Sequence, residues 1–170
     1  MRPLAALVGV ALLSSCTGDG VTVQRSPSAP PAQKTAVTLL DLCSGLNDIG
    51  FVGGVWKKGS TGFHCTTNEL PVGQAILWME VRGPNDSSAD SLILGADVKG
   101  DSTGDPVPKK FQEASEALLN KLELGVEDRL RTAMQTGQPL EVRTGKYDVV
   151  FASDLRSGIR ENRLTIRPAI

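Results

Sequence analysis

The chain contains few of the residues from which active sites and membrane spans are built. Its 170 residues include one histidine, one tyrosine, two tryptophans and three cysteines. The single imidazole is that of His64, so any serine–histidine–acid triad would have to use it, and a histidine-rich metal site is excluded. The longest apolar run has about ten residues, whereas a membrane-spanning helix needs about twenty. We therefore expect no spanning helix, no metal site and no cofactor.

Neither sign of charge forms a block along the chain. Lysine and arginine number 18, aspartate and glutamate number 19, and the formal net charge is −1. The segment 143–167 leans basic, but acidic residues are interleaved with its arginines. Proteins that bind nucleic acid carry a basic patch or stripe, and this pattern instead favours a solvated strand face. We expect no nucleic-acid partner.

Cys16 is the most informative residue that the sequence does contain. A basic residue at Arg2 precedes an apolar stretch at residues 4–13, and two serines stand directly before the cysteine. A basic start, a short apolar run and small residues are typical of an export signal, here residues 1–15. Cys16 directly after Leu13-Ser14-Ser15 resembles the lipobox of bacterial lipoproteins, in which the thiol is acylated and becomes the new N-terminus.

This resemblance implies that Cys16 is a lipid-attachment residue and that the chain contacts a membrane through its lipid. One acyl chain binds a bilayer weakly, but two or three hold a protein on it stably. The chain would be exported and anchored to a bacterial membrane. Thr17 stands where an aspartate would favour inner-membrane retention, which favours the outer membrane if the cell is Gram-negative. The alternative is an ordinary signal peptide in which the cysteine is coincidental.

The two remaining cysteines, Cys43 and Cys65, are expected to form a disulfide. Outside the cytoplasm an even pair of cysteines is usually oxidised. Closing a loop of about 23 residues is worth about 3 kcal/mol in the chain-entropy model. Two free thiols or half of a metal site are the alternatives. His64 lies beside Cys65, but the chain has no second histidine and no Cys-x-x-Cys motif.

Composition divides the mature chain into a tether and one folded domain. Residues 16–35 are rich in serine, proline and small residues, which predicts a disordered tether, and residues 36–170 suffice for one domain with its own core. Periodicity predicts helices at 36–49, 109–123 and around 126–134, a turn at 57–62, and strands at 63–67, 74–82, 91–98, 140–143, 147–152 and 163–167. This order predicts an α+β domain, an antiparallel sheet of about five to seven strands with helices packed on one face.

Candidate reactive groups in this domain are sparse. His64 with Asp41 or Asp48 is the combination that a small hydrolase would use. Two loops, at residues 84–90 and 101–108, are candidates for binding because long loops between packed elements often bind.

Two further groups of residues are assigned structural roles. Residues 101–105 place oxygen ligands at alternate positions, but Pro106 and Gln112 stand where a calcium-binding EF-hand loop needs glycine and glutamate, so we expect a solvated loop. The aromatic side chains near the predicted cysteine pair and hairpin are expected to pack in the core. These are Phe51, Trp56, Phe63 and Trp78.

The spacing of several structural residues resembles that of an uncharacterised family of exported bacterial proteins. The shared features are Cys43, the pair Gly50-Phe51, Trp56 and Cys65, within residues 39–134. The resemblance implies a disulfide-stapled envelope domain and assigns no catalytic residues. A lipobox is not a general feature of that family.

These observations together predict a lipid-anchored cell-envelope protein with a binding or structural role, and a protein of the envelope as its possible partner. An immunity or inhibitor lipoprotein directed against a secreted toxin is one alternative. A small envelope hydrolase that uses His64 is the other. We do not expect an enzyme.

Replacing Cys16 with serine should release the protein from the membrane, because the acylated thiol is the predicted anchor. Fractionation of cells fed labelled palmitate measures this: the parent protein should sediment with membranes and carry label, and the Cys16→Ser variant should do neither. Cys43→Ser is the matched control and should keep both properties. A Cys16→Ser variant that sediments like the parent would contradict the prediction.

Overall fold

The structure is a computed structural model that describes residues 38–100 and 107–170. The predicted export signal, Cys16, the predicted tether and the oxygen-rich segment 101–105 lie outside the described residues. None of the helices in the described part is long and apolar enough to cross a bilayer.

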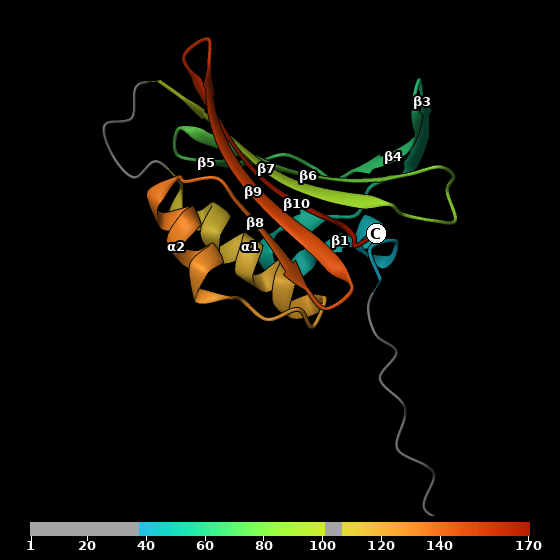
Figure 1. Cartoon of the computed structure of the whole chain (residues 1–170). Coiled ribbons are helices and arrows are strands. Elements are labelled where there is room, and N and C mark those ends of the chain that lie inside the picture. Colours follow the sequence, from blue (N-terminus) through green and yellow to red (C-terminus); the bar gives the residue numbers. More distant parts are fainter. Residues whose placement is uncertain (1–37, 101–106) are drawn as a thin grey trace, which may run out of the picture. The chain divides into compact units, whose positions relative to one another are not determined.

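An eight-stranded antiparallel sheet forms most of the described structure (Figure 1). Its strand order is β3-β4-β6-β7-β10-β9-β8, and β5 pairs separately with β6. The strands are β3 (Trp56–Gly59), β4 (Gly62–Thr66), β5 (Leu70–Val72), β6 (Ala75–Gly83), β7 (Ser91–Lys99), β8 (Leu140–Thr144), β9 (Tyr147–Arg156) and β10 (Ile159–Pro168).

Two helices connect β7 to β8 and lie on the same side of the sheet (Figure 1). They are α1 (Lys109–Lys121) and α2 (Asp128–Thr136). Each buries one apolar stripe, because apolar residues recur every three or four positions. The rings of Phe111 in α1 and Phe151 in β9 have centroids 6.3 Å apart, so α1 packs directly on the sheet.

Alternation along the strands decides which side chains form the core. In β6 the buried residues Ala75, Leu77, Met79 and Val81 alternate with more exposed ones. Successive side chains of a strand point to opposite faces, so this set faces the helices. The fully buried residues of β7, β9 and β10 continue the same layer, namely Leu92, Leu94, Ala96, Val149, Phe151, Leu164 and Ile166.

The predicted α+β class is confirmed, but the predicted number of strands is too small. The two unpredicted strands of the main sheet are β3 and β5. The turn predicted at 57–62 is shorter than expected. Residues 56–59 form the strand β3, which pairs with β4 in register from Trp56↔Cys65 to Gly59↔Gly62, so only Ser60 and Thr61 remain in the turn. β5 was not predicted because it contains Pro71, and proline is rare inside strands. Strands tolerate proline at the edge of a sheet.

The helix predicted at 36–49 is wrong. In its place the chain forms two short 3₁₀ helices, η1 (Asp41–Ser44) and η2 (Asn47–Ile49), separated by a strand β1 (Gly45–Leu46) that pairs with β2 (Phe51–Val52). Gly45 lies at φ 92°, and a Cβ there would stand 2.4 Å from the carbonyl oxygen of Phe51. The backbone therefore leaves the helical region at a glycine and folds back against its own continuation.

The disulfide between Cys43 and Cys65 is present, with an S–S distance of 2.09 Å and a Cα–Cα distance of 5.7 Å. Cys65 is fully buried on the helix-facing side of β4, and Cys43 is in η1. The bond therefore fixes the η1–β2 segment, which has no long helix of its own, against the main sheet. This segment contributes Leu39, Leu42, Leu46 and Phe51 to the core.

Removing the disulfide should destabilise the domain, because it closes a loop with a sequence separation of 22. We expect the double variant Cys43→Ala/Cys65→Ala to lose about 3 kcal/mol of unfolding free energy in urea denaturation. Parent protein reduced with dithiothreitol is the matched control and should lose a similar amount without any change of side chain. Equal stability of the oxidised and reduced parent would contradict the prediction.

Candidate functional site

The predicted acid–base combination is not assembled by hydrogen bonds. Asp41 accepts hydrogen bonds from the backbone N–H and the hydroxyl of Thr38, both at 2.7 Å, and these bonds lower the pKa of the Asp41 carboxyl. Within residues 38–100 and 107–170, His64 forms no hydrogen bond with Asp41 or Asp48. Its side chain lies on the face of β4 away from the helices, between Lys57 on one neighbouring strand and Arg82 on the other.

The surroundings of His64 form a shallow depression of about 220 Å³ that includes Ser60, Glu80 and Arg82. The Glu80 carboxylate is bound by the Arg82 guanidinium at 2.9 Å, so it is not directed at the imidazole. In the described part of the chain no three histidine, cysteine, aspartate or glutamate side chains gather as a metal site would require.

The loop at residues 84–90 is closed by its own side chains. The amide oxygen of Asn85 accepts hydrogen bonds from the backbone N–H of Ser87 at 2.9 Å and from the hydroxyl of Ser88 at 3.0 Å. This is a compact turn whose polar groups satisfy one another. In the second predicted loop, only Val107 and Pro108 are described, and Val107 is fully buried.

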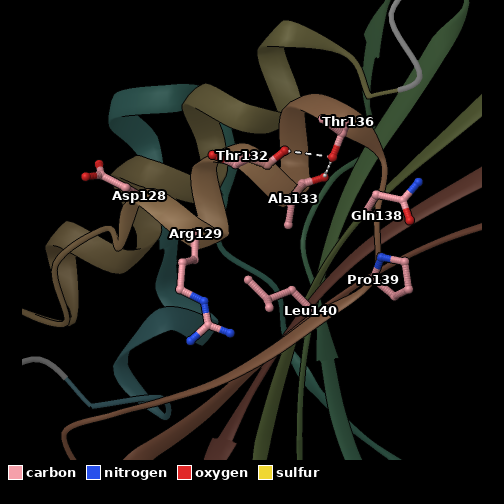
Figure 2. A pocket seen from close by; sticks show the side chains of 8 residues that line it. All are labelled: Asp128, Arg129, Thr132, Ala133, Thr136, Gln138, Pro139 and Leu140. Carbon is pink, nitrogen blue, oxygen red and sulfur yellow. Dashed lines mark hydrogen bonds between the residues drawn. The ribbon is translucent and has the colours of Figure 1, made fainter.

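A groove of about 450 Å³ lies between α2 and the edge strand β8 (Figure 2). Its helix side is formed by Asp128, Arg129, Thr132 and Thr136, and its strand side by Pro139 and Leu140. Figure 2 shows the Arg129 side chain extending from α2 into the space beside Leu140. The groove is open to solvent along the free edge of the sheet.

The face of the sheet opposite the helices carries the side chains that alternate with the buried ones, and we call it the open face. Its half-buried apolar residues form two groups, Ile76, Trp78 and Ile93 on β6 and β7, and Val150 and Ala152 on β9. Arg163 and Thr165 of β10 lie between the two groups.

Trp78 occupies a defined position on the open face. Gly95 pairs with Trp78 across β6 and β7, and a Cβ at Gly95 would stand 2.2 Å from Cε2 of the indole. The ring therefore covers the glycine backbone. The indole Nε1 donates a hydrogen bond to Oδ2 of Asp97 at 3.3 Å, which fixes its orientation.

Ion pairs lie between and around these apolar residues. Arg163 pairs with Glu161 on β10, in the middle of the face, and the other pairs are Arg82–Glu80, Arg143–Asp148, Arg167–Glu141 and Arg156–Asp154. The Arg143 hydrogen bond lowers the pKa of the Asp148 carboxyl. Within the described residues, Oδ1 of Asp97 and Nε of Arg163 are buried without a hydrogen-bond partner.

Sequence reasoning missed the position of Trp78, which was expected in the core. The signal was available: Ala75, Leu77, Met79 and Val81 alternate with it, so period two places Trp78 on the other face. The glycine beneath the ring was not predictable, because it depends on the register between β6 and β7.

Comparison with known proteins returned no match among protein-family models, curated proteins or solved structures. The function must therefore be argued from the surfaces described above.

The contact between Trp78 and Gly95 can be tested by a double-mutant cycle. Gly95→Ala should cost about 1 to 3 kcal/mol of unfolding free energy, because the added methyl overlaps the indole. In a Trp78→Ala background the same change should cost much less, since the overlapping ring is gone. Urea denaturation measures all four proteins. An equal cost in both backgrounds would show that the ring does not lie over the glycine.

Proposed function

We propose that this protein is an exported, lipid-anchored module of the bacterial cell envelope that binds another protein through its open face. The observation that supports this most directly is the ordered indole of Trp78 on an exposed sheet face that carries both apolar residues and ion pairs.

The composition of the open face resembles that of a protein-binding surface. Protein interfaces are enriched in tryptophan and arginine. Residues that dominate binding energy also tend to be tryptophan, tyrosine or arginine. The open face carries Trp78 and five arginines, of which Arg163 lies between its two apolar groups.

The charge of the open face favours a protein over a polyanion. Each of these five arginines is paired with an acidic side chain, so the face carries no uniform positive field. A protein surface that itself combines apolar residues with charges of both signs is complementary to it. Such charge pairs contribute more to the choice of partner than to affinity.

The anchor places this binding domain at a membrane. The proposed acylated Cys16 attaches it, and the tether predicted for residues 16–35 separates it from the lipid surface. The Cys43–Cys65 disulfide is compatible with an oxidising compartment outside the cytoplasm. In a Gram-negative cell, Thr17 favours the outer membrane.

Site-specific photo-cross-linking in intact cells tests this function. A photoreactive amino acid at Ile93, on the open face, should give a discrete adduct with one envelope protein. The same amino acid at Asn120, exposed on α1, should not. Adding Trp78→Ala should abolish the Ile93 adduct, since loss of a central tryptophan typically costs about 2 kcal/mol or more. An adduct that forms equally at Asn120, or that survives Trp78→Ala in a folded protein, would contradict binding through this face.

A further inference from the structure

β3 and β8, the strands at the two ends of the main strand order, differ in their charge pattern. Among the described strands, β3 pairs only with β4, and β8 pairs only with β9. β3 carries Lys57 and Lys58 side by side, and lysines on an edge oppose pairing with a further strand. β8 instead carries Glu141 and Arg143, two residues apart on the same face. Of these two edges, β8 is the one whose charges are complementary to a copy of itself.

The backbone of β8 has a defined set of outward-facing groups. β8 and β9 are joined by a two-residue turn, so Thr144 and Tyr147 form the closing pair that exchanges hydrogen bonds. Such pairs alternate along an antiparallel ladder. Hence Thr144, Val142 and Leu140 bond to β9, and the N–H and C=O groups of Glu141 and Arg143 point to the free edge. No loop or side chain among the described residues bonds to these groups.

The free edge of β8 is accessible because a groove separates it from α2. The groove of about 450 Å³ between α2 and β8 runs beside Leu140, which is only half-buried (Figure 2). The inward side chains of a strand added next to β8 would enter this groove. The helix stripe that faces it contains Thr132 and Thr136, which are small enough to allow close approach.

We propose that two copies of this chain associate by antiparallel pairing of their β8 strands, with the twofold axis at Val142. In this register Glu141 of one copy lies opposite Arg143 of the other, and each such pair exchanges both backbone hydrogen bonds. An axis at Glu141 would place two carboxylates opposite each other, and an axis at Arg143 would place two guanidinium groups opposite each other. Charge therefore selects one of the registers that the backbone allows.

In the single chain, both side chains are bound by partners on the inner strands β9 and β10. Glu141 is bound by Arg167 at 2.8 Å, and Arg143 is bound by Asp148 at 2.9 Å. Pairing of two copies joins these pairs into a network across the axis. Exposed ion pairs contribute little energy, so they select the register, and the backbone bonds and the inward side chains supply the remaining affinity.

The consequence for function is a continuous sheet with two open faces side by side. This consequence rests on the proposed function, because a doubled face matters only if that face binds, and because lipid anchors concentrate the copies on one membrane. Two linked sites raise the apparent affinity for a partner that is itself repeated or surface-bound.

A disulfide cross-link at the axis tests the pairing in the membrane-bound full chain. Val142→Cys places one thiol from each copy at the directly opposed, closely spaced position, so mild oxidation with copper phenanthroline should give a dimer on a non-reducing gel. Thr144→Cys is the matched control and should give little dimer, because its opposite residue is Leu140 of the second copy. Dimer with both variants alike, or with neither, overturns the proposal.

Charge variants in the Val142→Cys background test the register. Glu141→Arg and Arg143→Glu each leave one sign of charge on the edge, and each alone should lower the yield of dimer about tenfold. Co-expression of the two, with tags of different size, should restore a mixed dimer to the parent level. Failure of the mixed dimer to form, with both variants folded by circular dichroism, overturns the proposal. Trp78→Ala, which should abolish the Ile93 photo-adduct, should leave the Val142→Cys dimer unchanged, so this result and that of the proposed function are separable.

Discussion

The pairing of β10 with both β7 and β9 is the interaction on which the rest of the structure depends. β10 lies against β7 from Ile159↔Lys99 to Ile166↔Leu92, and against β9 along its whole length. It joins the half of the sheet built before the helices to the half built after them. Without it, β8 and β9 would be an isolated hairpin, which is marginally stable by itself in water. The last strand in the chain thus creates both the helix-covered core and the open face.

The few aromatic residues of the chain are distributed unequally between the two faces of the sheet. Phe51, Phe111 and Phe151 are fully buried on the core side, where large apolar side chains stabilise the fold most. Trp78 lies on the open face, so its large apolar side chain does not contribute to the helix-covered core. Its position requires a glycine on the adjacent strand and a carboxylate within hydrogen-bond distance, so β7 is adapted to hold an indole there. Neither feature contributes to packing of the helix-covered core.

Much of this fold was predictable, because long strands with one covered face have a clear period. β6 and β7 alternate along nine residues each, and α1 shows its apolar stripe at helical spacing. The disulfide was predictable because the chain was expected to be exported and because an even number of cysteines remains after Cys16. The two strands that were not predicted have local causes. Lys57 and Lys58 are residues typical of a turn, and Pro71 is not typical of a strand.

The segment at 36–49 failed for a different reason. Its apolar residues recur at intervals of three, as in Leu39 to Leu42 and Cys43 to Leu46, an interval that a 3₁₀ helix satisfies as well as an α-helix does. Only the conformation of Gly45 and the disulfide decide between them. The two proposed binding surfaces could not be derived from the sequence for a related reason, since both depend on register. Trp78 meets Gly95 because of the alignment of β6 with β7, and Glu141 and Arg143 turn their backbone groups outward because of the alignment of β8 with β9. The alternation of side chains along one strand indicates which face a residue takes, but it does not indicate which residue of the neighbouring strand lies opposite.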